Sequence, residues 1–350
     1  MRILDFRSDT VTKPGPDMRA AMAAADVADD ILDRDPTMDR LERQVAERLG
    51  HEAGLWTPSG CMANAVALMV HLQRGDRFLT PALAHVMGQE LGTPAWLAGG
   101  MPEVLPWEGG PGKITPHQVA RHAVNPGHYY AMRTTLLSLE NTHNFAGGTF
   151  YSASEHRALV ESAQTHGLKV HLDGARLWNA SVASRESLSD LAWGVDSVNV
   201  CLSKGLGAPL GSVLCGGRAF IEQARRVRKM LGGAVRQGGV VAAAGLVALD
   251  HLPRLAEDHA KARRLAEGLR ALGFNVAEPP TNILMVPVLD IPLALRMLED
   301  AGIRALPVGS ALRFLTHRDL AAEDVEDALQ RMKPLVEPLL TTWEGPRPMA

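Results

Sequence analysis

The sequence is poor in cysteine and in aromatic residues, and it has no long apolar run. Only three of its 350 residues are cysteine, at positions 61, 201 and 215, without the spacing of a metal site. We therefore expect free thiols in a reducing, cytoplasmic compartment, with neither a disulfide framework nor a bound metal. The longest apolar stretch, residues 240–249, is too short to span a bilayer, and the N-terminus turns polar without the apolar core of a signal peptide.

Charge and aromatic content restrict the kinds of partner. Aromatic residues make up 5% of the chain, which offers little surface for stacking on bases. The formal net charge is −3, so no excess of positive charge favours binding of nucleic acid. The chain is 46% hydrophobic and 21% charged, which is typical of a globular protein with a substantial core. We expect a small-molecule ligand as the partner, with no nucleic acid and no membrane.

Strand-like and helix-like segments alternate along most of the chain. Short apolar runs with β-branched residues predict strands, and apolar residues three and four positions apart predict the helices between them. This alternation favours an α/β fold with a mostly parallel sheet flanked by helices. We predict an N-terminal arm and a large domain over residues 1–249, and a small C-terminal α+β domain over residues 250–350.

The predicted elements can be placed along the chain. Strands are expected at 53–57, 77–80, 135–139, 169–172, 197–202, 212–215, 283–288 and 312–315. Helices are expected at 16–25, 36–49, 62–72, 154–166, 221–230, 237–252, 255–272, 292–301 and 322–340. Residues 98–113 are rich in glycine and proline and are predicted to form a surface loop.

Two of the predicted strands lead directly to an ionisable residue. Asp173 closes one strand, and Lys204 follows the next. Because the carboxyl ends of parallel strands meet where α/β sheets bind ligands, the two side chains are expected to face one crevice. Pyridoxal phosphate requires such a pair, since a carboxylate keeps its pyridine nitrogen protonated and a lysine holds its aldehyde as a Schiff base. The alternative is a capping aspartate and an unrelated surface lysine, but the glycine-rich turn at 205–209 favours the cofactor.

Other residues could serve the same crevice. The turn Ser59-Gly60-Cys61 opens directly into a helix, whose N-terminus could hold a phosphate, although Ser59 could also be an ordinary N-cap. His85 follows a strand and could stack on the ring or act as a general base, although a solvated side chain is the alternative. A polar cluster at 140–144 also follows a strand, which favours a functional role.

One arginine is placed to recognise an anion. Arg313 lies between apolar residues of a strand predicted in the second domain. A guanidinium group in that setting either extends to the edge of the sheet or pairs with a desolvated anion. The α-carboxylate of an amino acid is such an anion, because it accepts two parallel hydrogen bonds from arginine.

From residue 5 almost to its end, the chain resembles the low-specificity L-threonine aldolases of the fold-type-I pyridoxal-phosphate enzymes. The matching segments are RSDTVTKP (7–14), PSG (58–60), ENTHN (140–144), HLDGAR (171–176), LSKG (202–205), RKMLGG (228–233), RQ (236–237) and LTH (315–317). The opening RSDTVT and the run KMLGG are specific to this group. The resemblance implies dimers paired into tetramers.

The resemblance also implies a role for each matching residue. Lys204 would bind the cofactor covalently, Asp173 would pair with its ring nitrogen, and His85 would stack on its ring. Ser8 and Arg313 would hold the substrate carboxylate. The further cofactor contacts would come from Ser59, Gly60 and Cys61 at the phosphate, Arg176 near the phenolic oxygen, and Lys229 and Arg236 across a subunit interface.

Three positions depart from the family's pattern. Cys61 stands where relatives commonly have threonine, so a hydroxyl contact to the phosphate is missing. Gln89 stands where some relatives have a tyrosine that could shape the aldehyde pocket. The family's second active-site histidine corresponds to His128, which lies farther from the following Arg133-Thr134 than in the family.

The implied reaction is retro-aldol cleavage of L-threonine, L-allo-threonine or another β-hydroxy-α-amino acid to glycine and an aldehyde. His85, His128 or a bound water would remove the proton of the β-hydroxyl. The main alternative is β-elimination or transamination with the same cofactor. A non-catalytic cofactor-binding protein is disfavoured by Ser8 and Arg313. A dinucleotide oxidoreductase is disfavoured further, because no Gly-x-Gly-x-x-Gly motif follows a strand.

Overall fold

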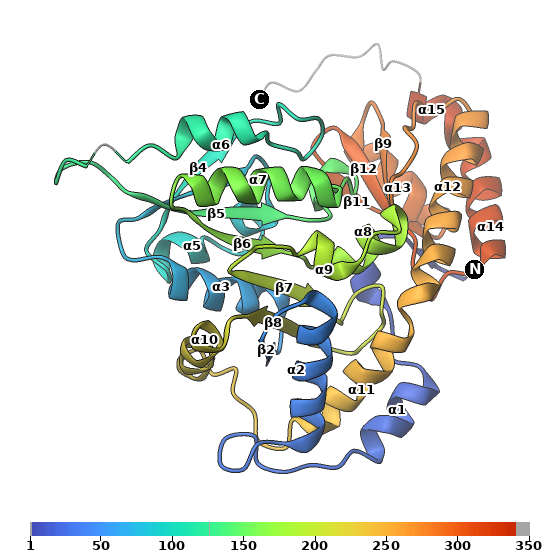
Figure 1. Cartoon of the computed structure of the whole chain (residues 1–350). Coiled ribbons are helices and arrows are strands. Elements are labelled where there is room, and N and C mark those ends of the chain that lie inside the picture. Colours follow the sequence, from blue (N-terminus) through green and yellow to red (C-terminus); the bar gives the residue numbers. More distant parts are fainter. Residues whose placement is uncertain (1, 126, 341–350) are drawn as a thin grey trace.

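A seven-stranded sheet flanked by helices forms the centre of the computed structural model, which describes residues 2–125 and 127–340 (Figure 1). The strands follow the order β2 (Ala53–Thr57), β8 (Ser212–Gly216), β7 (Ser197–Cys201), β6 (Lys169–Asp173), β5 (Thr134–Glu140), β3 (Arg77–Pro81) and β4 (Met101–Leu105). Strand β8 is antiparallel to both of its neighbours, and the other strands share one direction. The predicted α/β fold with a mostly parallel sheet is confirmed.

Helices cover both faces of this sheet, because successive side chains of a strand point to opposite sides. On β2, Leu55 packs in one cluster with residues of α3 and α10, whereas the adjacent Trp56 packs in another with residues of α2 and α11. The helices of this part are α1 (Pro16–Ala23), α2 (Pro36–Leu49), α3 (Gly60–His71), α4 (His85–Gly88), α5 (Thr93–Trp96), α6 (Pro116–His122), α7 (Ala153–Thr165), α8 (Leu177–Ser184), α9 (Leu188–Leu191), α10 (Arg218–Met230) and α11 (Gly239–Asp250).

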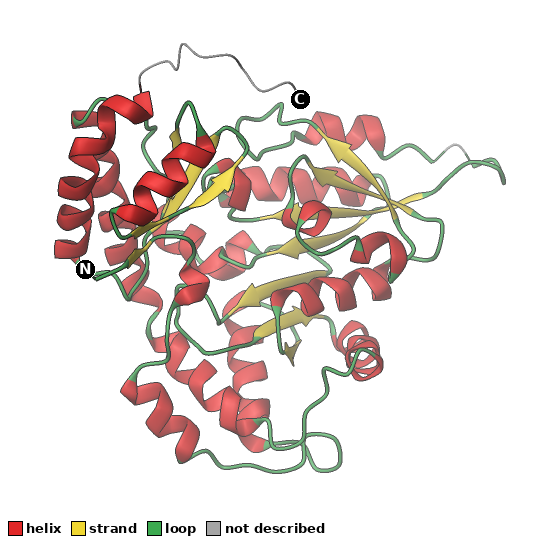
Figure 2. Cartoon of the chain, turned by 180° about the vertical axis from the view of Figure 1, so that it is seen from behind, coloured by secondary structure: helices red, strands yellow, loops and turns green. Residues whose placement is uncertain are grey.

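A second hydrophobic core lies beside the large sheet (Figure 2). It surrounds an antiparallel sheet of β11 (Leu306–Val308), β12 (Ala311–Leu315) and β9 (Ile283–Pro287), with α12 (Leu255–Ala271), α13 (Ile291–Asp300), α14 (Ala322–Met332) and α15 (Val336–Leu340). Leu4 and Phe6 are buried in this core, and β1 (Leu4–Asp5) pairs with β10 (Ile303–Arg304). The N-terminal segment therefore packs with the C-terminal part of the chain. The predicted domain boundary after residue 249 stays a prediction.

Small residues let α11 pack closely in the first core. A Cβ on Gly245 would come within 2.8 Å of the Leu41 side chain of α2. Among the described residues, no single helix is both long and apolar enough to cross a membrane. The pair Gly239–Asp250 and Leu252–Ala271 meets that length and composition only when joined across a bend of 53°.

Two predicted segments were wrong in part. Residues 98–113 were predicted as a loop but contain β4, which forms the edge of the large sheet and, among the described strands, pairs only with β3. An edge position tolerates Pro102, and the partly exposed side chains of β4 leave no regular apolar alternation. The helix predicted over 322–340 is interrupted, because Pro334 falls between α14 and α15 and cannot continue the helical hydrogen bonds.

Candidate active site

The carboxyl ends of β5, β6 and β7 bring several predicted site residues to one edge of the large sheet. Asp173 ends β6 beside Glu140, which ends β5, and Lys204 follows β7. The thiol of Cys61 and the imidazole of His85 each lie within the electrostatic influence of both Asp173 and Lys204. The carboxylate and the amine therefore lie near the same two side chains, at the sheet edge where the crevice is predicted.

The Asp173 carboxylate is buried and held by three N–H donors. Its Oδ2 accepts a hydrogen bond from Asn64 Nδ2 at 2.9 Å. Its Oδ1 accepts from the backbone N–H of Ala175 at 3.1 Å and from Asn199 Nδ2 at 3.4 Å. These donors come from α3, β7 and the turn after β6, so three elements fix the orientation of one carboxylate.

His85 is held by two buried glutamates. Its backbone N–H donates to Glu140 at 2.6 Å, and its Nδ1 lies 2.8 Å from Glu90 Oε1, which also accepts from Asn64 at 2.9 Å. Burial alone would lower the pKa of His85, but the hydrogen bond to Glu90 and the charge of Asp173 raise it above its ordinary value. Burial, together with the nearby Asp173, also raises the pKa of Glu90.

The start of α3 provides a site for an anion. Ser59 caps the helix by accepting the N–H of Met62 at 3.2 Å. A Cβ on Gly60 would come within 2.8 Å of Cys201 Sγ, so glycine allows the helix to begin directly against β7. Within the described residues, the backbone N–H groups of Gly60 and Cys61 have no acceptor. These free donors lie at the positive end of the α3 dipole, which attracts anions.

A buried ion pair stands near the small core. Arg176 donates to both carboxylate oxygens of Asp9, at 2.7 and 2.8 Å. Burial opposes the charge on Asp9, but the Arg176 guanidinium holds the pKa of that carboxyl well below its usual range. Arg176 is therefore neutralised by a carboxylate of its own chain.

Arg313 lies beside this pair without a carboxylate partner. It donates to Asn144 Oδ1 at 2.8 Å, an acceptor it shares with Arg176, and to the carbonyl of Arg7 at 3.2 Å. Its Nε is buried without an acceptor, and no carboxylate among the described residues forms an ion pair with it. Burial and the neighbouring Arg176 lower the pKa of Arg313 to about 10, so its guanidinium stays positive at neutral pH. Ser8 directly follows Arg7 and caps the turn Asp9–Val11.

Three predicted residues do not reach this crevice within one chain. Lys229 is exposed near the end of α10, and Arg236 forms an ion pair with Asp29 at 3.2 Å. His128 precedes β5 and therefore lies toward the opposite edge of the sheet, stacked on Tyr130 with ring centroids 5.1 Å apart.

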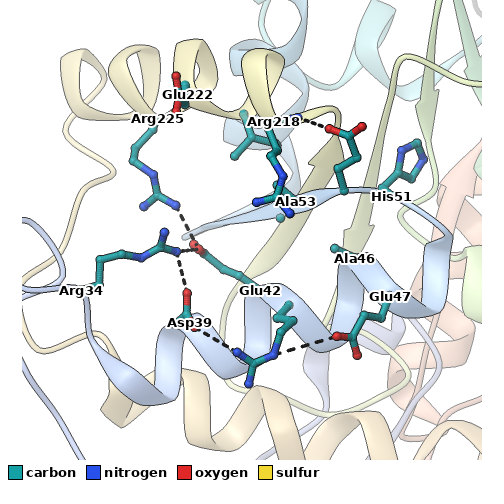
Figure 3. Close-up of a pocket in the computed structure, with 14 residues that line it drawn as sticks. Arg34, Asp39, Glu42, Ala46, Glu47, His51, Ala53, Arg218, Glu222 and Arg225 are labelled. Atoms are coloured by element: carbon teal, nitrogen blue, oxygen red, sulfur yellow. Dashed lines mark hydrogen bonds and ion pairs between the residues drawn. The ribbon is translucent and has the colours of Figure 1, made fainter.

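A separate hollow between α2 and α10 is also rich in charge (Figure 3). Glu42 accepts from Arg225 at 3.1 Å and from Arg34 at 3.3 Å, and Figure 3 shows both guanidinium groups directed at it. Arg43 in turn pairs with Asp39 at 3.3 Å. Because these charges neutralise one another, we interpret the hollow as a structural ion-pair network.

Cys61, His85 and Glu90 each place a potential metal-ligand atom within 4.8 Å of the others. The Nδ1 of His85 and the carboxylate of Glu90 already form a hydrogen bond with each other. Burial, followed by the carboxylates of Glu90 and Asp173, raises the pKa of Cys61 to about 11. Metal binding needs the thiolate, so we interpret this group as part of the crevice wall.

Sequence reasoning missed three residues that shape the crevice. Asn64 is the one polar side chain between Cys61 and Val70 in an otherwise apolar helix, and that contrast could have identified it. Asp9 lies within a matched motif, but only the structure reveals its pairing with Arg176. Glu90 gives no local signal, because a single glutamate after a short helix is common on protein surfaces.

The sheet order, the crevice at the strand ends and the second small sheet define a fold-type-I protein of the pyridoxal-phosphate class. The family model described as Beta-eliminating lyase matches residues 5–290. Low-specificity L-threonine aldolase 1 of Arabidopsis thaliana is 41% identical, over 97% of this chain and 99% of that protein. The low specificity L-threonine aldolase of Escherichia coli K12 is 38% identical, over 93% and 97%.

A solved structure gives the same result for the fold. The threonine aldolase of Leishmania major superposes with a TM-score of 0.81 at 21% identity, covering 95% of this chain and 99% of that one. The chain belongs to the beta-eliminating lyase family, and its resemblance to the low-specificity L-threonine aldolases is confirmed.

Proposed function

We propose that this protein cleaves L-threonine, L-allo-threonine and other β-hydroxy-α-amino acids to glycine and an aldehyde, which is acetaldehyde from threonine. It is a pyridoxal-phosphate-dependent lyase with a small amino-acid substrate. The observation that carries the proposal is the unpaired, buried guanidinium of Arg313 beside the crevice of Asp173 and Lys204. A buried cation without its own anion is costly, so a bound carboxylate would complete the site.

The residues fit pyridoxal phosphate. Asp173 would hold the proton on the ring nitrogen, and Lys204 would bind the aldehyde carbon. The free N–H groups of Gly60 and Cys61, with the Ser59 turn, would bind the phosphate. When bound, the cofactor supplies an electron-poor ring that withdraws electrons from the bonds at the substrate's Cα.

Further cofactor contacts follow from the positions of two other residues. His85 would stack on the ring from the loop after β3. Arg176, whose guanidinium is fixed by Asp9 and Asn144, would lie near the phenolic oxygen. Because Asp9 already neutralises Arg176, this arginine can orient an oxygen without acting as the carboxylate receptor.

Arg313 and Ser8 would hold the substrate carboxylate. The Arg313 guanidinium can donate two parallel hydrogen bonds to it, which fixes the rotation of the amino acid about its Cα. Such fixation would determine which bond at Cα is presented for cleavage. The hydroxyl of Ser8, one residue from the carbonyl that Arg313 contacts, would add a third donor.

His85 is our first candidate for the base that removes the β-hydroxyl proton. Its Nδ1 is engaged by Glu90, which fixes the imidazole and leaves Nε2 for the substrate. His128 and a bound water are the other candidates. A positioned base contributes on the order of 10² to 10⁴ in rate, so loss of one histidine should slow the reaction without abolishing it.

The active protein is proposed to be a homodimer, paired further into a homotetramer. Lys229 and Arg236 lie away from the crevice of their own chain, so they would reach the cofactor phosphate of a second copy. The segment that carries His128 projects from the body of the chain, and Tyr129 and Tyr130 beside it are 99% and 74% exposed (Figure 1). Such exposed aromatic side chains are typical of protein interfaces.

We also place the protein in the cytoplasm. Its three cysteines are free, and Cys201 and Cys215 are buried. Free thiols persist in a reducing compartment.

Product analysis tests the proposed reaction. Purified protein loaded with pyridoxal phosphate and incubated with L-threonine should release glycine and acetaldehyde in equal amounts. Release of a keto acid and ammonia would assign the chain to β-elimination instead. Parallel incubations with the four threonine stereoisomers should give cleavage of the L-forms only.

A further inference from the structure

A line of buried polar side chains leads from Asp173 between α3, β6 and β7. Asn64 Nδ2 lies 2.9 Å from Asp173 Oδ2, and Asn64 Oδ1 lies 3.1 Å from His171 Nε2. His171 Nδ1 lies 2.8 Å from Ser197 Oγ, which lies 2.7 Å from His71 Nε2. Each of these residues is at most 7% exposed. We call these five residues the His171 network.

The direction of every hydrogen bond in this network follows from Asn64. Its amide nitrogen lies 2.9 Å from both Asp173 and Glu90, and carboxylates accept hydrogen bonds. A flipped amide would place oxygen against both carboxylates, so Asn64 Oδ1 must face the other way and accept. Asn199 Nδ2, at 3.3 Å, and His171 Nε2 are its donors.

The tautomers of both histidines are then assigned. Burial lowers the pKa of His171 to about 4 and of His71 to about 3, so each carries a single proton at neutral pH. Because His171 Nε2 donates to Asn64, its Nδ1 must accept the hydroxyl proton of Ser197. The oxygen of Ser197 is then left to accept from His71 Nε2. The remaining His71 Nδ1 has no partner among the described residues, so it ends the line.

We propose that His171 is a positioning residue, which locks the Asn64 amide so that one of its N–H groups donates to Asp173 and supports the negative charge of that carboxylate. Every donor in the network points toward that carboxylate, and aligned hydrogen bonds strengthen one another in a buried setting. The inference rests on the proposed function, in which Asp173 holds the proton on the cofactor's ring nitrogen. Losing the His171 donor should therefore weaken cofactor binding, although His171 does not touch the crevice.

Two substitutions at this position separate positioning from packing. In His171→Gln the amide nitrogen can take the place of Nε2 and still donate to Asn64. In His171→Asn the shorter side chain cannot reach Asn64. We expect His171→Gln to bind pyridoxal phosphate within about twofold of the wild-type Kd, whereas His171→Asn binds about tenfold more weakly, with a shifted visible absorption band.

His156→Asn is the matched control. His156 is also buried, its pKa is lowered to about 4 by burial, and its Nε2 bonds only the carbonyl of Trp193 at 3.1 Å. This variant should lose stability but keep the wild-type Kd and absorption band. Wild-type Kd and spectrum in a folded His171→Asn variant would overturn the proposal. A wild-type protein that binds no pyridoxal phosphate would contradict the proposed function instead.

A second measurement uses the wild-type protein without cofactor, so it does not depend on whether the variants fold. Wild-type protein labelled with ¹⁵N in its histidine side chains should show His71 and His171 as neutral imidazoles protonated on Nε2. Protonation of His171 on Nδ1 would overturn the proposal, because Asn64 would then have no histidine donor.

Discussion

At the scale of single residues, the site depends on unequal pairing of charges. Arg176 has a carboxylate partner in Asp9, whereas the neighbouring Arg313 has only neutral acceptors within the part of the chain that the structure describes. A buried guanidinium without a counterion favours binding of an anion of matching shape. This difference supports the proposal that Arg313 recognises the substrate and that Arg176 has a structural role toward the cofactor.

Substitution of Arg313 tests this division. In Arg313→Ala the KM for threonine should rise about a hundredfold, because a charge-assisted double hydrogen bond is lost, with a smaller change in kcat. Arg313→Lys, the matched control, keeps the positive charge but cannot donate two parallel hydrogen bonds, and it should raise KM about tenfold. A KM within twofold of the wild type in Arg313→Ala would contradict the assignment.

Some of these residues could be predicted from sequence because each follows an element boundary. Asp173 ends an apolar strand, Lys204 lies three residues after the end of another, and Ser59 stands directly before a helix. Glu90 could not be predicted, because its contacts with His85 and Asn64 are made across the fold. Local patterns do not encode which side chains meet across such distances.

At the scale of elements, the contact of α2 with β2 and α10 is held by one buried carboxylate. Glu42 of α2 accepts the backbone N–H of Trp56 in β2 at 2.8 Å and the guanidinium of Arg225 in α10 at 3.1 Å. The helix also approaches the strand closely, since a Cβ on Gly54 would lie 2.5 Å from the Glu42 carbonyl. Glu42 therefore links three elements at a point with no room for larger side chains.

Removing that charge should destabilise the fold. Glu42→Gln removes one of the two buried carboxylates, Glu42 and Asp30, with which both Arg225 and Arg228 pair. We expect the free energy of unfolding to fall by about 3 kcal/mol. Glu47→Gln, one turn further along α2, removes an exposed carboxylate that lies 4.0 Å from Arg43 and should cost less than about 0.5 kcal/mol. Chemical denaturation measures both variants. Equal losses in the two variants would show that the buried ion pairs of Glu42 stabilise the fold no more than the exposed pair of Glu47 does.

The two elements that sequence analysis misplaced have separate physical causes. Strand β4 pairs with one described strand and contains a proline, so it lacks the apolar alternation of a central strand and has a single β-branched residue, Val104. The break at Pro334 is not visible in the periodicity of the sequence, because the apolar spacing continues on both sides of it, in α14 and α15. Buried, regular elements were predicted well, because their apolar residues recur in the sequence with the period of a helix or a strand.

At the scale of the whole molecule, one chain does not gather all the residues that the reaction is proposed to need. The N-terminal segment returns to the small core and brings Ser8 and Asp9 to Arg313 and Arg176. Arg236 lies elsewhere, paired with Asp29. This arrangement supports the proposed assembly, in which copies would exchange such residues.

Subunit complementation tests the exchange. Lys204→Ala and Arg236→Ala chains should each have little activity at limiting cofactor. Co-expressed, they should form mixed dimers in which one crevice has both residues intact, restoring about a quarter of the wild-type sites. A mixture no more active than the better parent would show that Arg236 serves its own chain.

The most direct test of the account is the attachment point of the cofactor. Holoenzyme reduced with borohydride and digested should yield a single pyridoxyl-labelled peptide that contains Lys204, and the Lys204→Ala variant should yield none. Label on a different lysine, or threonine cleavage at the wild-type rate by Lys204→Ala, would contradict the central claim that Asp173 and Lys204 bind one cofactor.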